Sequence, residues 1–365
     1  MMEGLEMTGA RLWKVLFLMM VVLSLMAVPG VKAGTEASSS GQFSIGAVAP
    51  QINKVTFYAS DHTTEVTAAT PTNAYWIDVQ VTDLNTMDDI KEITIWLYYG
   101  TNSSQLSPIP AGNVNPQTYV ILKYERTPFS DKPGQWAFYY ANGTKIGTTF
   151  GTWKIVNQSD PATWDQSVGT FSVEIVVGKV AHEANDGKVA GDWNFQVKVT
   201  DNEGLQSNTY TGYGYTMNWY GEIWVTQTFA FGTVNPNSTN NKLTSPQTGY
   251  LDVYVVSNGN FDVNVKGDEN WTGVNNSSRV VKLVTTNPGD KQIRIKINSI
   301  NDPTSAGAIT TTYTVWLNDQ SGPTQDGSAA NGNGAHFTAY LWLDVGTNID
   351  QDTYVGHVYF QVTNA

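Results

Sequence analysis

The chain has 365 residues, of which 41% are hydrophobic and only 14% are charged, and its formal net charge is −12. A chain this long and apolar can build two or more folded domains and lacks the composition of a disordered protein. The acidic balance without a basic stripe argues against nucleic acid as a partner, and the absence of cysteine excludes disulfide bonds and thiolate metal sites.

Residues 1–33 are predicted to be a secretory signal peptide. Arg11 and Lys14 precede an apolar run at residues 15–28, and residues 31–33 (Val-Lys-Ala) fit a small-x-small cleavage site. The run is shorter than the roughly 20 residues of a bilayer-spanning helix, and an uncleaved N-terminal anchor is the alternative. We therefore expect a secreted or cell-surface protein that meets the membrane only transiently, through this segment.

Residues 34–50 are predicted to be a flexible leader, because they are mostly small and polar. Within it, Phe43, Ile45 and Ala47 are apolar at every second position, which is the spacing of side chains on one face of a strand.

Residues 75–82 and 192–200 show the clearest strand pattern in the chain. Both alternate apolar and polar side chains, and both lead into a Val-Thr-Asp tripeptide that ends at Asp83 or Asp201. No convincing amphipathic helix is present, and residues 174–186 are the best of the weak helical windows. Other short strands are expected at residues 51–58, 92–99, 119–124, 135–140, 152–156, 170–177 and 208–219. Regularly spaced short strands with turn residues between them predict an all-β domain over residues 51–220.

A second all-β domain is predicted over residues 221–365, with its boundary between Tyr220 and Gly221. Residues 321–334 predict a long flexible loop between two of its strands. Those strands are expected at residues 223–232, 250–256, 261–265, 280–284, 292–297, 311–317, 336–345 and 353–362. The predicted fold class is therefore all-β, with two β-sandwich domains of the Ig-like or jelly-roll type in tandem after a signal peptide.

Two sets of motifs resemble those of known surface proteins. The series Val-x-Val-Thr-Asp, Ile-Thr-Ile-x-Leu and Val-Lys-Val-Thr-Asp-x-x-Gly, between residues 79 and 204, resembles Ig-like domains of archaeal and bacterial surface proteins. Phe-Gly-Thr-Val at residues 231–234 and Thr-Tyr-Val-Gly at residues 353–356 make the second domain similar to pilus-type and envelope-type β-sandwiches. The resemblance implies a protein that binds, assembles or spaces parts of a cell envelope, without catalysis.

Acidic side chains are predicted to gather at one end of the first sandwich. If residues 75–82 and 192–200 are strands B and F of an Ig-like domain, they run in the same direction, and Asp83 and Asp201 lie at the same pole. Calcium takes about six to eight oxygen ligands, and such a pole suits it. The alternative is that these residues only bond their own turns. The loops that follow the two strands add Asn85, Asp88, Asp89 and Glu203.

Asn-x-Ser/Thr sequons predict glycosylation on an exported protein. In a chain this rich in asparagine and threonine, several of them are expected by chance. They lie at Asn102, Asn142, Asn157, Asn237, Asn270, Asn275 and Asn276.

Tyr213 and Tyr215 alternate within a tyrosine-rich stretch, and this spacing predicts that both rings lie on one face. If that face points outward, it is a candidate platform for stacking on sugars. If it points inward, the rings belong to the core, as tyrosines in strands often do.

Common catalytic motifs are absent from the sequence. His182-Glu183 is not followed by the second histidine of a zinc protease, and neither a nucleophile elbow nor a phosphate loop is present. We therefore expect no enzymatic activity. Three roles stay open: a structural or adhesive surface protein, a filament subunit that donates residues 43–48 as a strand to the next copy, and a carbohydrate-binding module. The expected partners are other envelope proteins, the protein itself or surface glycans.

Overall fold

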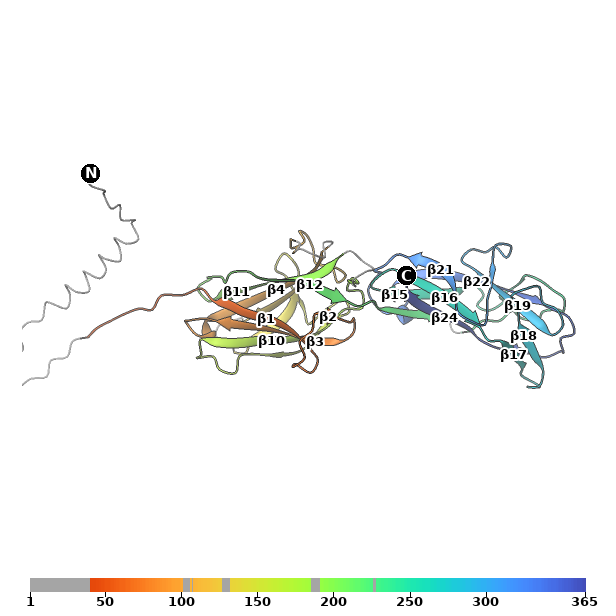
Figure 1. Cartoon of the computed structure of the whole chain (residues 1–365), viewed down its shortest axis with the longest axis horizontal. Helices are drawn as coiled ribbons and strands as arrows, with labels where there is room; N and C mark the ends of the chain where they lie inside the picture. Colours follow the sequence, from red (N-terminus) through yellow and green to blue (C-terminus); the bar gives the residue numbers. More distant parts are fainter. Residues whose placement is uncertain (1–39, 101–105, 107, 127–131, 185–190, 226–227) are drawn as a thin grey trace, which may run out of the picture. The chain divides into compact units, whose positions relative to one another are not determined.

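The structure is a computed structural model of the whole chain (Figure 1). It describes residues 40–365 except 101–105, 107, 127–131, 185–190 and 226–227. The predicted signal peptide and residues 34–39 of the leader lie outside the described residues. Residues 1–46 and 47–365 form two units, and residues 40–46 of the first unit are exposed and have no regular secondary structure.

The described chain is all-β, as its sequence predicts. The only helical segments among the described residues are the 3-10 turns η1 (Met87–Asp89) and η2 (Ala329–Asn331). The weak helical window at residues 174–186 forms no helix in its described part, and it begins inside strand β10 (Val168–Val176). Within the described ranges, no helix is long and apolar enough to cross a bilayer.

Strands β1 to β12 form two facing sheets. One sheet has the order β1-β3-β10-β9-β8, and the other has the order β2-β12-β11-β4-β5-β6-β7. Besides β10, the strands are β1 (Gln51–Ala59), β2 (Ala68–Ala69), β3 (Ala74–Thr82), β4 (Ile90–Gly100), β5 (Tyr119–Glu125), β6 (Gln135–Tyr139), β7 (Lys145–Gly147), β8 (Thr149–Phe150), β9 (Trp153–Ser159), β11 (Asp192–Asp201) and β12 (Tyr210–Met217).

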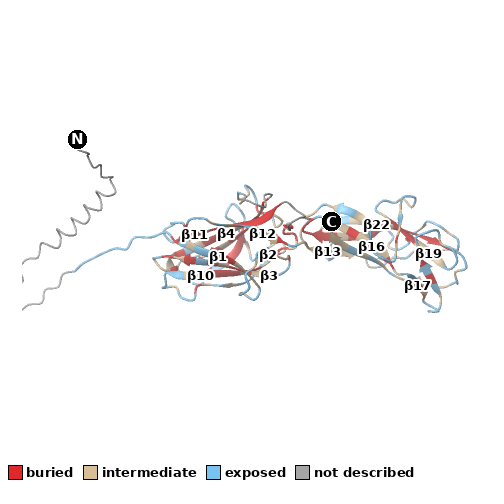
Figure 2. Ribbon diagram, in the orientation of Figure 1, coloured by how far each residue is buried: buried red, intermediate tan, exposed pale blue. Residues whose placement is uncertain are grey.

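The apolar faces of these two sheets enclose the first core (Figure 2). Ile77, Val79 and Val81 of β3 are fully buried, and the polar residues between them are more exposed. In the facing sheet, Val197 of β11 lies opposite Ile95 of β4, and both are also fully buried. A slip of one residue would turn such a strand's apolar side chains to water, so burial fixes the register.

Strands β13 to β24 form a second pair of sheets with a separate core. The larger sheet has the order β13-β15-β22-β19-β18-β17-β23, with β14 paired to β22 and β20 paired to β19, and the smaller one has the order β21-β16-β24. The strands are β13 (Gly221–Val225), β14 (Asn241–Lys242), β15 (Leu251–Ser257), β16 (Phe261–Gly267), β17 (Asn270–Gly273), β18 (Val280–Leu283), β19 (Gln292–Asn298), β20 (Gly307–Ala308), β21 (Thr314–Gln320), β22 (Ala335–Val345), β23 (Tyr354–Val355) and β24 (Val358–Asn364).

The strand groups divide between β12 and β13, where the sequence predicts the boundary. No described strand of the first group pairs with a described strand of the second. Packing and hydrogen bonds still join the groups: Val180 packs with Val256, and the side-chain amide of Asn258 donates to the carbonyl of Ala181 at 2.8 Å. Because residues 47–365 form one compact unit, the count of two domains stays a prediction.

Candidate functional site

The ends of β3 and β11 bring acidic side chains together, as the sequence predicts. Asp83 follows the last residue of β3, and Asp201 is the last residue of β11. Asp201 pairs in register with Ile90, the first residue of β4, so η1 and its carboxylate Asp89 lie beside it. We call the group Asp83, Asp89, Asp201 and Glu203 the acidic pole.

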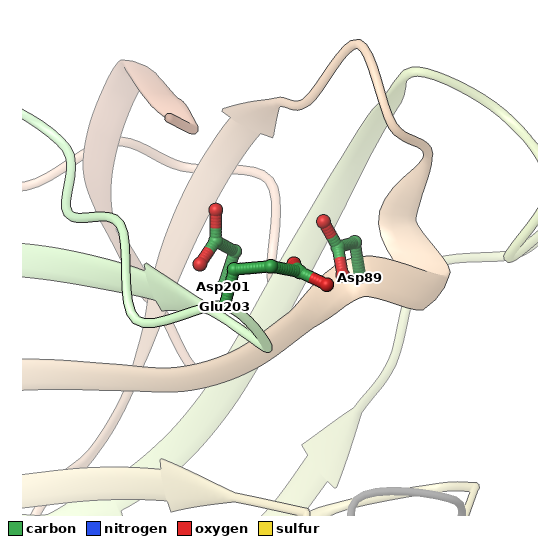
Figure 3. Close-up of side chains that lie close together, drawn as sticks. All are labelled: Asp89, Asp201 and Glu203. Carbon is green, nitrogen blue, oxygen red and sulfur yellow. The ribbon is translucent and has the colours of Figure 1, made fainter. Parts of the chain in front are cut away.

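Three of these carboxylates lie close together (Figure 3). One oxygen from each of Asp89, Asp201 and Glu203 lies within 4.8 Å of the others. The backbone fixes this arrangement, because the N–H of Asn202 donates to the carbonyl of Asp89 at 2.9 Å. Gly204 closes the turn after Asp201 with a φ of 86°, a left-handed conformation that favours glycine.

Two members of the acidic pole each hold a buried oxygen that accepts no hydrogen bond from the described part of the chain. Asp83 is 1% exposed and Asp201 is fully buried. One oxygen of each accepts a backbone N–H, from Asn85 at 2.8 Å and from Leu205 at 2.7 Å. The second oxygen, Oδ2 in both residues, has no hydrogen-bond partner among the described residues. A buried polar atom left unpaired costs about 1–3 kcal/mol, and more when it is charged.

The four carboxylates also repel one another. Burial, followed by the charge of Glu203 and a hydrogen bond with it, raises the pKa of Asp89 to about 6. Burial raises the pKa of Asp83 as well, and the charges of Asp201 and Glu203 add to this effect. Within the described residues, none of the four forms an ion pair with a lysine or arginine.

Asp88 does not join the acidic pole, although the sequence grouped it there. Its Oδ1 pairs with Arg126 at 2.9 Å and with Lys132 at 2.6 Å, and the hydrogen bond from Lys132 is the main cause that lowers its pKa. The reason is local geometry, because the tight 3-10 turn η1 points the neighbouring side chains of Asp88 and Asp89 in different directions.

Asn85 links the acidic pole to the leader. Its backbone N–H donates to Oδ1 of Asp83, and its side-chain oxygen accepts the N–H of Val48 at 2.7 Å. Sequence analysis placed this oxygen among the metal ligands. In the structure it binds the backbone N–H of Val48, just before β1.

Tyr213 and Tyr215 do not share a face, contrary to the expectation from their spacing. Trp193 pairs with Tyr215 and Phe195 pairs with Gly212, so three steps on β12 oppose two on β11. This β-bulge turns the two rings apart. Tyr213 is 58% exposed, whereas the Tyr215 ring packs against Phe195 with centroids 5.5 Å apart. A platform of two rings is not formed.

The sequon asparagines are exposed wherever the structure describes them. Asn102 lies outside the described residues. The exposed ones are Asn142, Asn157, Asn237, Asn270, Asn275 and Asn276. Each is open to a glycosylating enzyme, and glycosylation itself stays a prediction.

An apolar pocket opens at the other end of the first sandwich, and sequence analysis did not find it. Tyr75 and Trp193, near the starts of β3 and β11, line it together with Phe57 and Tyr215. Its cavity volume is about 60 Å³, and its walls are almost entirely apolar. The feature of the sequence that could have indicated the pocket is the pair of small residues in β2, Ala68 and Ala69. Small side chains leave space beside the larger aromatic rings.

Comparison of the sequence with known proteins gives no relative from which a function could be inferred. Neither a protein-family model nor a curated protein matches the sequence. The acidic pole, the leader and the apolar pocket are therefore the features on which a function has to be argued.

Proposed function

We propose that the chain is an exported, non-catalytic protein of a cell surface, with a structural or adhesive role and Ig-like sandwiches. The observation that carries this proposal is the leader: Phe43 is 86% exposed and Ile45 is 79% exposed, although their neighbours are small and polar. Apolar side chains that are exposed to solvent on an extended segment favour contact with another surface, because contact buries them. The predicted signal peptide and sequons support an exported location.

A filament subunit that donates a strand is the second candidate, and the apolar pocket favours it. Among the described residues, β1 pairs with β3 and, at Tyr58, with Glu65, and β12 pairs with β2 at Thr216 and Met217, so part of each edge is open to an added strand. Phe43 and Ile45, two residues apart, would point to the same side of such a strand and would fill the pocket with apolar surface.

The donated leader would come from a second copy. The N–H of Val48 is held by Asn85 at the acidic pole, and Phe43 can lie at most about 18 Å of extended chain from Val48. Phe57 lines the pocket and lies six residues after Gln51, which is about 20 Å along β1. Val48 lies before Gln51, on the side away from the pocket residue. A leader that comes from a second copy is not limited by this length.

Light scattering on residues 34–365 tests the role of the leader. We expect masses above that of the monomer that increase with concentration, and a monomer when Phe43 and Ile45 are both changed to serine. Ser44→Ala is the matched control, because Ser44 lies on the opposite face of an added strand, and it should assemble normally. A monomer in every case would contradict the filament candidate. Assembly that the double variant leaves intact would contradict the role of the leader in contact.

A further inference from the structure

The acidic pole shows two independent features of an ion site. Carboxylate oxygens of Asp89, Asp201 and Glu203 converge within 4.8 Å (Figure 3). Separately, Asp83 and Asp201 are almost fully buried, and each keeps one oxygen without a hydrogen-bond partner among the described residues. A turn whose acidic residues only bonded their own backbone would not leave these oxygens buried and unpaired.

We propose that the acidic pole binds one calcium ion, which also fixes the root of the leader. Two oxygens that each lie about 2.4 Å from one ion can be at most about 4.8 Å apart. The convergence of the three carboxylates meets this limit. Asp83 lies outside this group of three, so its carboxylate has to turn toward the ion to become a fourth ligand. One oxygen of Asp83 and one of Asp201 are already occupied by the N–H groups of Asn85 and Leu205.

The ligand set selects the kind of metal. All donors are carboxylate oxygens, which hard cations prefer, whereas zinc and copper prefer nitrogen or sulfur ligands. Magnesium requires near-ideal octahedral geometry and keeps several waters, but calcium accepts flexible arrangements of about six to eight oxygens. Acidic side chains from two loops and the end of a strand, partly buried, fit calcium better.

The position of Asp83 connects the ion to the leader. If Oδ2 of Asp83 turns to the ion, its Oδ1 stays free to accept the N–H of Asn85, and the side-chain oxygen of Asn85 accepts the N–H of Val48. Calcium would thus order the short loop after β3 and the segment where residues 34–50 join β1. This inference does not depend on the assembly of copies, since it concerns one chain alone.

Calorimetric titration of calcium into residues 34–365 tests the site. We expect one ion per chain with a dissociation constant on the order of 0.1–1 mM, the range of extracellular modules. The melting temperature should be higher in calcium than in chelator, and Asp201→Asn should abolish both effects. Asp165→Asn is the matched control. Asp165 is an exposed carboxylate on a loop near the acidic pole, because other residues of this loop form backbone hydrogen bonds with Asp83 and Met87. It should bind like the natural sequence.

Two further results separate binding from a structural defect. In chelator, Asp201→Asn should melt no lower than the natural sequence, because it removes a repelling charge and keeps the shape of the side chain. Calcium should also slow hydrogen exchange at the amide of Val48. No calcium binding by the folded protein, equal binding by Asp201→Asn, or a preference for magnesium would each overturn the proposal.

Discussion

At the scale of single residues, burial determines how His182 responds to protons. Its ring stacks on Tyr99 with centroids 4.0 Å apart, and burial lowers its pKa, against a hydrogen bond with the carbonyl of Glu183 that raises it. The folded state therefore favours the neutral ring. This contribution to stability is present above the unfolded pKa, near 6.5, and is lost as the pH falls through the lower folded value.

The His182→Phe variant keeps the stacked ring and removes this titration. We expect the free energy of unfolding of the natural protein to fall more than that of the variant between pH 7 and pH 5. Denaturant unfolding in chelator measures the difference. Because both proteins retain the carboxylates Asp83 and Asp89, comparing their pH profiles cancels the effect of these two groups on stability. Parallel pH profiles would contradict the depressed pKa.

Gly178 shows how tightly the first core is packed. A Cβ atom at this position would lie 2.4 Å from the indole of Trp153, which is fully buried and donates to the carbonyl of Pro116 at 2.8 Å. Because the ring has no room to move, Gly178→Ala should destabilise the protein by about 1–3 kcal/mol. Gly307→Ala is the control, since open space surrounds that position. Equal unfolding midpoints for both variants would contradict this packing.

At the scale of elements, strand alternation predicted β3 and β11 well because each buries one face. The same pattern predicted that Asp83 and Asp201 share a pole, since both strands run toward it. The orientation of Asp88 was not predictable, because adjacent residues in a 3-10 turn diverge and no sequence period shows it. The bulge at Tyr213 was missed for a similar reason, since it depends on pairing with β11 and not on the residues of β12 alone.

Truncation of a buried side chain in β4 tests the predicted core face. Ile95 is fully buried between the sheets, whereas Val156 of β9 is 52% exposed. Ile95→Ala should cost about 2–5 kcal/mol of stability, and Val156→Ala should cost well under 1 kcal/mol. Chemical denaturation compares them. A similar small loss in both would mean that this face of β4 is not core.

At the scale of the whole molecule, Asn258 joins the two strand groups. It is fully buried, its amide donates to the carbonyls of Ala181 and Asn218 at 2.8 and 2.9 Å, and its oxygen accepts the N–H of Tyr220 at 2.6 Å. Removing this side chain leaves several buried backbone groups unpaired. The two groups should then unfold less cooperatively.

Asn258→Ala should lower the stability by about 1–3 kcal/mol or more, and calorimetry should show two transitions where the natural chain shows one. Asn142→Ala, in an exposed turn, is the control. Two transitions in the natural chain would indicate that the groups are already independent domains. A single, unshifted transition in the variant would contradict the role of Asn258.

The most direct test of the calcium site is a crystal structure of residues 34–365 grown in millimolar calcium. We predict a single ion about 2.3–2.6 Å from oxygens of Asp89, Asp201 and Glu203, with Oδ2 of Asp83 turned toward it and Val48 ordered beside Asn85. The absence of an ion, with waters or a basic side chain bonded to the buried oxygens of Asp83 and Asp201, would contradict it.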